Sequence, residues 1–177
     1  MIIGLILSVV AIIILTAVDL YIKDWAVNVL APVKSMDFIK IGDVDLVGLY
    51  YTENTGAAFS FFNDAPLVLT IFVGILLLAV AVYGIADKYK NPVKTVCLIM
   101  ILSGGLGNLI DRIRNGYVID YLEFRFVNFA IFNFADVLVT CGAVALIIYI
   151  WVSETSGKRR RGDLHNEISK YRGNYDR

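Results

Sequence analysis

Four segments of the chain are long, apolar and free of charged residues. They cover residues 1–18, 65–86, 95–110 and 137–153, with lengths of 18, 22, 16 and 17 residues. A helix that crosses a bilayer needs about 20 mostly apolar residues. The second segment reaches this length alone, and the others reach it by including Asp19, Asp111 and Asp136 at their ends. Because the segments are apolar on all sides and carry no polar stripe, they predict four transmembrane helices.

We expect these helices at about residues 2–22, 66–86, 94–113 and 134–153. They form a single membrane domain, residues 1–153, followed by a polar tail, residues 154–177. The first segment has no basic start and no small-residue cleavage site before Asp19, so we expect a retained helix and not a cleaved signal peptide.

The charges between the apolar segments differ in sign. Residues 19–66 carry a net charge of −4 and residues 111–136 a net charge of −1, whereas residues 87–94 carry +2 and residues 154–177 carry +3. Loops rich in lysine and arginine stay on the cytoplasmic side of a membrane. The pattern therefore predicts that both termini are cytoplasmic and that the two long loops face outward.

The first outward loop contains two stretches rich in β-branched and aromatic residues, 38–41 and 45–51. Such stretches predict a small antiparallel sheet, which we place in an extracytoplasmic β-region at about residues 37–62. Asn54, Thr55 and Gly56 then predict a turn. The expected fold class is an all-α integral membrane protein with four transmembrane helices and this β-sheet inserted between helices 1 and 2.

Composition excludes several classes of function. Of the 177 residues, 58% are apolar and 18% are charged, and the net charge is zero, so we expect no nucleic-acid partner. Two cysteines and one histidine leave few of the usual metal ligands. We therefore expect no metal site built from cysteine or histidine residues.

Several polar residues at the ends of the spans favour structural roles. Asp19 and Lys23 are four residues apart, so they share a helix face and form a candidate ion pair. One helix face at the outer end of the third span also carries Asn108, Asp111 and Arg112. We interpret the charged pair, Asp111 and Arg112, as locking the helices and the loop backbone together. Asn133 is a candidate N-cap of the fourth helix.

Asp120 and Asp136 are harder to explain structurally. Both lie in apolar, aromatic surroundings, and neither has a basic residue three or four positions away. Unpaired carboxylates in such places are costly, so two of them near one interface suggest a shared site. Two close carboxylates hold one proton between them near neutral pH, which provides an acid and a base together. By spacing alone, the residues fit either an aspartyl peptidase or a proton or ion pathway.

Five motif blocks resemble bacterial lipoprotein signal peptidase, also called signal peptidase II. In order, they are Asp19-Leu-Tyr-Ile-Lys23, Asn54-Thr-Gly-Ala-Ala-Phe59, Gly104-Gly-Leu-Gly-Asn108-Leu-Ile-Asp111-Arg112, Gly116-Tyr-Val-Ile-Asp120 and Phe132-Asn133-Phe-Ala-Asp136. They extend over roughly residues 16 to 140. One mild departure is Tyr121, which stands where phenylalanine is common in the family.

The resemblance implies an intramembrane aspartyl endopeptidase of the bacterial cytoplasmic membrane. Its substrates are diacylglyceryl-modified prolipoproteins, and it cuts just before the lipidated cysteine, near the outer face, in contact with membrane lipids and without a metal or cofactor. Asp120 and Asp136 match the two catalytic aspartates. The resemblance further implies substrate-binding roles for Asn54, Asn108, Arg112 and Asn133, and structural roles for Asp19, Lys23 and Asp111.

Two other functions remain open from the residues alone. A small transporter or proton-conducting subunit would use Asp111, Asp120 and Asp136 as a relay and would cleave no peptide. A membrane scaffold held by buried polar contacts would tolerate Asp120→Asn.

Overall fold

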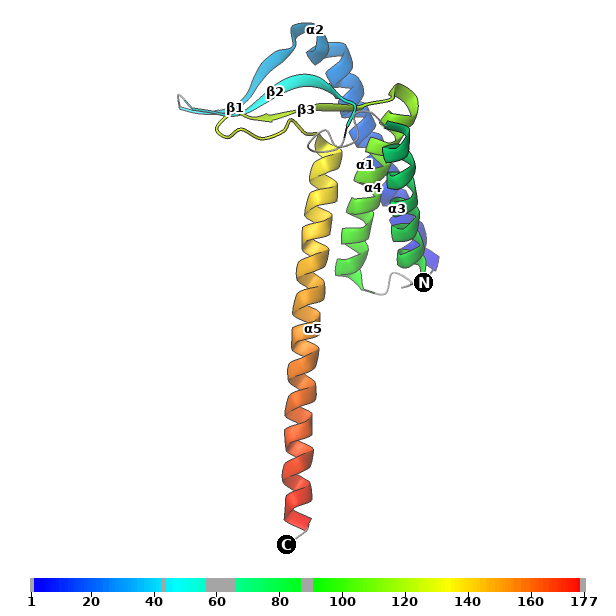
Figure 1. Cartoon of the computed structure of the whole chain (residues 1–177), viewed down its shortest axis with the longest axis vertical. Helices are drawn as coiled ribbons and strands as arrows, with labels where there is room; N and C mark the ends of the chain where they lie inside the picture. The colour runs from blue at the N-terminus through cyan, green and yellow to red at the C-terminus, as the bar shows by residue number, and fades with distance from the viewer. Residues whose placement is uncertain (1, 43, 57–65, 87–90, 176–177) are drawn as a thin grey trace.

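The computed structural model of the chain describes residues 2–42, 44–56, 66–86 and 91–175, with side chains as far as Thr155. In chain order its elements are α1 (Ile2–Trp25), η1 (Ala26–Leu30), α2 (Ala31–Val33), β1 (Ser35–Ile41), β2 (Val44–Asn54), α3 (Pro66–Ala86), α4 (Pro92–Asn115), β3 (Val118–Phe124) and α5 (Phe134–Tyr175). Figure 1 shows the helices side by side and the sheet across one end of them.

Within the residues that the structure describes, four helical segments are long and apolar enough to cross a membrane: Ile2–Val33, Leu67–Ala86, Pro92–Asn115 and Phe134–Thr155. This confirms the four predicted spans. The first helix continues beyond residue 22 into η1 and α2. The last helix continues beyond Ser153 to Tyr175, because the glutamate, lysine and arginine residues of this region are good helix formers.

The helix α4 lies at the centre of the bundle and packs against α1, α3 and α5. Three glycines on it allow the close approach. A methyl group at Gly104 would overlap the backbone of Ala135 in α5, and one at Gly105 would overlap Leu77 in α3. A methyl group at Gly107 would overlap the carboxylate of Asp19 in α1. The polar residues of α4 are therefore held close to the ends of the other helices.

The sheet is antiparallel, with the strand order β1–β2–β3. The small sheet predicted between the first two spans is confirmed in β1 and β2, and residues 57–62 of the expected β-region lie outside the described residues. The third strand, β3, comes from the segment after α4 and pairs Asp120 with Thr52 of β2. It places Asp120 at the junction of sheet and helices.

A small hydrophobic core joins the sheet to α1. Ala26 and Leu30 of η1 are fully buried against Leu49, Ile119 and Tyr121 of the sheet. The π-helical turn is a local widening of the helix, of a kind often found at functional sites. This core fixes where β3, and therefore Asp120, stands relative to α1.

Candidate functional site

A buried ion cluster lies where α1 meets α4. The ammonium of Lys23 is 2.9 Å from Asp19 Oδ2 and 3.0 Å from Asp111 Oδ2, and it donates a hydrogen bond of 2.8 Å to Asn108 Oδ1. Three oxygen atoms therefore lie within 3.0 Å of the ammonium group. The pairing of Asp19 with Lys23 is thus confirmed, and Asp111 joins it from a distant part of the chain.

The two aspartates of this cluster also hold the backbone of neighbouring elements. Asp19 Oδ1 accepts a hydrogen bond of 3.0 Å from the amide of Ala135, at the start of α5. Asp111 Oδ2 accepts one of 3.2 Å from the amide of Ile119 in β3. Removing Lys23 would leave two carboxylates buried without a cation. Asp111 therefore connects α4 to the backbone of β3, whereas the locking role predicted for Asp111 together with Arg112 stays a prediction.

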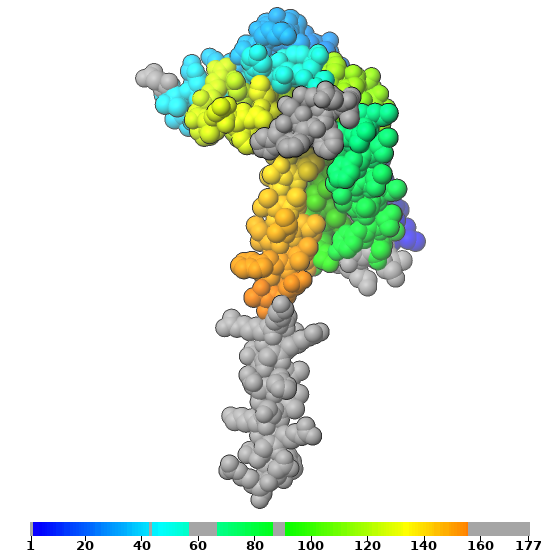
Figure 2. All heavy atoms as spheres, viewed as in Figure 1, coloured from blue at the N-terminus to red at the C-terminus, as the bar shows by residue number. Residues whose placement is uncertain are grey.

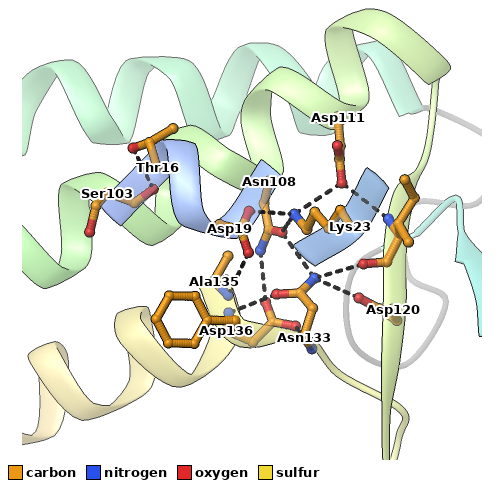
Figure 3. A network of polar contacts seen from close by, with 12 residues as sticks. Thr16, Asp19, Lys23, Ser103, Asn108, Asp111, Asp120, Asn133, Ala135 and Asp136 are labelled. Atoms are coloured by element: carbon orange, nitrogen blue, oxygen red, sulfur yellow. Dashed lines mark hydrogen bonds and ion pairs between the residues drawn. The ribbon is translucent and has the colours of Figure 1, made fainter. Parts of the chain in front are cut away.

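Asn133 and Asn108 connect the ion cluster to Asp120 and Asp136 (Figure 3). The amide nitrogen of Asn133 donates to Asp120 Oδ1 at 2.7 Å and to Asn108 Oδ1 at 3.1 Å. Asn108 in turn donates to Asp136 Oδ1 at 2.8 Å. The structure therefore brings Asp120 and Asp136, from β3 and α5, into one hydrogen-bonded network.

Asp136 and Asn133 also form the N-terminal cap of α5. Asn133 Oδ1 accepts from the amide of Asp136 at 2.9 Å, and Asp136 Oδ2 accepts from the amide of Asn133 at 3.1 Å. This reciprocal pair is a capping box, which satisfies two amides that the helix leaves free. The predicted capping role of Asn133 is confirmed. The side chain of Asp136 thus lies at the positive end of the α5 dipole.

Asp120 lies in different surroundings. Its side chain is almost fully buried, with an exposed fraction of 1%, and Asn54 donates a hydrogen bond of 2.8 Å to its Oδ2. Burial and, to a smaller extent, the charge of Asp136 raise the pKa of Asp120 to about 6, against the lowering effect of the hydrogen bonds from Asn54 and Asn133 and of the Lys23 charge. The same Asn54 accepts from the amide of Gly56 at 3.1 Å, which confirms the predicted turn.

The two aspartates line a cavity of about 550 Å³ between α3, α4 and α5. Asn54, Asn108 and Arg112 line it as well. Among the described residues, the Nε atom of Arg112 is buried without a hydrogen-bond partner, and its Nη1 makes a long contact of 3.4 Å to the Asn108 carbonyl. The guanidinium therefore retains donors for a molecule in the cavity. Five of the nine residues predicted from sequence thus share one cavity.

The other four predicted residues support this cavity without lining it. The polar layer behind the cavity consists of Asn133, Asp19, Lys23 and Asp111. In the described part of the chain, no group of three His, Cys, Asp or Glu side chains is placed to hold a metal ion.

An aromatic wall of the cavity was not predicted from the sequence. Phe124, Phe129 and Phe132 line it, and Phe124 contacts the other two rings at centroid distances of 5.8 and 4.9 Å. Figure 2 shows that the strands and the loop after β3 gather at one end of the molecule, above the helices. The density of phenylalanines in residues 124–134 was the available signal, but their spacing has no regular period.

The family model for Signal peptidase (SPase) II matches residues 11–152. The lipoprotein signal peptidase of Streptococcus pyogenes serotype M5 (strain Manfredo) is 39% identical over 152 residues, which is 85% of this chain and 97% of that protein. The lipoprotein signal peptidase of serotype M18 (strain MGAS8232) of the same species shows the same identity and coverage.

The fold of the chain is also similar to the folds of two solved structures. A bacterial membrane enzyme determined by the in meso method at 2.3 Å resolution has a TM-score of 0.70 and 25% sequence identity, covering 85% of this chain and 90% of the other. A second one, at 1.9 Å resolution, has a TM-score of 0.66 and 26% identity, covering 81% and 91%.

Proposed function

Since the chain belongs to the signal peptidase II family, we propose that it cleaves prolipoproteins with Asp120 and Asp136 as the catalytic pair. Family membership makes the protein a lipoprotein signal peptidase and a multi-pass bacterial membrane protein. It favours the peptidase over the transporter and scaffold hypotheses. The observation that supports the catalytic pair is that both carboxyl groups line one cavity and share Asn133 as a neighbour.

The surroundings of the two aspartates favour different roles for them, one as the base and the other as the acid. Asp136 lies in the first turn of α5, at the positive end of the helix dipole, so we assign it the role of the base. Asp120 is buried, and its raised pKa of about 6 makes it the member that holds the proton. A water between them would lose a proton to Asp136 and attack the scissile carbonyl carbon. Asp120 would hydrogen-bond to the carbonyl oxygen and then protonate the leaving amine.

The cavity suits a lipidated peptide. One wall is aromatic and aliphatic, and the other carries Arg112, Asn108 and Asn54 with free or exchangeable hydrogen-bond donors. We propose that these three residues bind the substrate's main chain and lipid-bearing end, with the diacylglyceryl-modified cysteine just after the scissile bond. From the charge pattern of the loops we propose that both termini are cytoplasmic and that the site lies near the extracytoplasmic face.

Cleavage of a lipidated prolipoprotein by the purified protein in detergent, with EDTA present, tests this function. We expect a mature product that begins with the lipidated cysteine, identified by mass spectrometry. The same precursor without its diacylglyceryl group is the control, and we expect its cleavage to be much slower. A folded protein that leaves both precursors intact would contradict the proposal.

The proposed roles predict how cleavage depends on pH. Above about pH 6, Asp120 loses the proton that it needs as the acid, so kcat/KM falls as the pH rises through about 6. In Asn54→Leu, the hydrogen bond that lowers the pKa of Asp120 is lost, so the falling limb moves to higher pH. The pH profiles of kcat/KM for both proteins measure this shift. A limb that stays in place, or moves to lower pH, would contradict the role of Asp120 as the acid.

A further inference from the structure

The first turn of α5 carries four backbone amides that have no partner within a helix. Each of them nevertheless has an acceptor. The amides of Asn133 and Asp136 use each other's side chains, at 3.1 and 2.9 Å. The amide of Ala135 donates to Asp19 of α1 at 3.0 Å, and the amide of Phe134 donates to the hydroxyl of Tyr121 at 3.1 Å. The start of α5 is thus held by α1 on one side and by β3 on the other.

Tyr121 is the next residue after Asp120 on β3. Neighbouring side chains on a strand point to opposite faces, so Tyr121 points away from Asp120 and into the core between sheet and α1. It is buried, with an exposed fraction of 3%, among Ala26, Leu30 and Ile119. Packing alone would be served by a phenylalanine, whereas a buried hydroxyl needs a hydrogen-bond partner. The partner is an amide of the turn that carries Asp136.

The backbone next to this contact is also paired. The amides of Tyr121 and Leu122 both donate to the carbonyl of Phe132, at 3.0 and 2.7 Å, and the amide of Phe132 donates to the carbonyl of Leu122 at 3.0 Å. The chain therefore enters α5 along β3. The hydroxyl of Tyr121 extends this attachment past Asn133 into the first residue of the helix.

We propose that Tyr121 is a positioning residue whose hydroxyl fixes the first turn of α5, and with it Asp136, against the strand that carries Asp120. This inference rests on the proposed function of the two aspartates. Tyr121 does not line the cavity and acts only through Phe134 and the turn that follows it. A loose turn would let Asp136 move relative to Asp120 without removing either carboxyl group.

Tyr121→Phe tests the inference, because it removes one oxygen atom and keeps the ring. We expect kcat to fall about tenfold, which is less than the hundredfold that a misplacement of about 1 Å can cost, while KM stays close to that of the wild type. Asp120 faces Asp136 from α5 and Lys23 from α1, and the charge of Asp136 raises its pKa. A wider separation weakens this effect, so the falling limb of kcat/KM moves to lower pH.

Tyr51→Phe is the matched control. Tyr51 belongs to the same core, is 7% exposed, and donates its hydroxyl to Glu53 at 3.1 Å, away from α5. We expect its kcat, and the pH at which its kcat/KM falls, to equal those of the wild type. An equal loss in both variants would assign the effect to the core in general and overturn the proposal, as would unchanged kinetics in Tyr121→Phe.

Hydrogen exchange provides a measurement that does not depend on cleavage. In Tyr121→Phe, peptides that cover residues 133–137 should exchange faster than in the wild type and in Tyr51→Phe, because the amide of Phe134 has lost its acceptor. Unchanged exchange there would overturn the positioning role even if activity fell. If exchange is faster in Tyr121→Phe but the wild type cleaves no prolipoprotein, the result would support the hydrogen bond between Tyr121 and the start of α5 and would contradict the proposed function instead.

Discussion

Replacing Asp120 or Asp136 with asparagine is expected to lower kcat for prolipoprotein cleavage by about 10³-fold or more, because each variant lacks one half of the acid–base pair. The two variants fail for different reasons. Asp136→Asn removes the base that activates water, and Asp120→Asn removes the acid that protonates the leaving amine. Initial rates of cleavage at saturating lipidated substrate measure the loss.

Asp24→Asn is the control for this pair, since Asp24 is an exposed aspartate of α1 outside the cavity and the ion cluster. Its rate should equal that of the wild type. Asparagine at 136 can accept on only one atom where aspartate accepts on two, so thermal unfolding must show that each variant is folded. A folded variant that retains most of its rate would remove that aspartate from the mechanism.

The second large effect concerns stability and not chemistry. Lys23→Met should lower the free energy of unfolding by about 3–5 kcal/mol, because it leaves Asp19 and Asp111 buried without their cation. Lys23 itself is only 1% exposed, so water cannot replace the lost partner. We expect a lower yield of folded protein from membranes and a lower midpoint of thermal unfolding in detergent.

Lys40→Met offers a matched comparison on the sheet. Lys40 also contacts two aspartates, Asp37 at 3.5 Å and Asp45 at 3.1 Å, but its side chain is 51% exposed. Exposed ion pairs contribute little, because water and salt screen them. The midpoint of thermal unfolding of Lys40→Met should therefore stay close to that of the wild type. Equal midpoints for Lys40→Met and Lys23→Met would refute the importance of the buried cluster. Adding Asp19→Asn and Asp111→Asn to Lys23→Met should recover part of the stability.

Local sequence predicted the spans and the contacts between near neighbours. The pairing of Asp19 with Lys23 and the cap of Asn133 on α5 follow from separations of four and three residues, so helix geometry alone predicts them. Polar positions in and near the spans indicated eight of the nine site residues, and the motif resemblance added Asn54 to the site and implied the roles. It did not say which of them would share a cavity and which would lie behind it.

The strand β3 was not predicted, although residues 118–124 contain β-branched and aromatic side chains. A single strand has no stability by itself, and this one forms because β2 offers a free edge. The hydroxyl of Tyr121 likewise accepts a hydrogen bond from the amide of Phe134 only because β3 lies beside the start of α5. Neither contact has a signal within a short window of the chain.

The sequence by itself determined the membrane class, the four spans and the family, because a bilayer core without water requires continuous apolar helices that satisfy their own backbone hydrogen bonds. Only the tertiary structure decided how Asp120 and Asp136 meet. Their connection runs through Asn133 and Asn108, and Lys23 holds Asn108 from α1, so three separate segments contribute to it. Such a network depends on how helices and sheet pack over long separations in the chain, and local composition does not fix that packing.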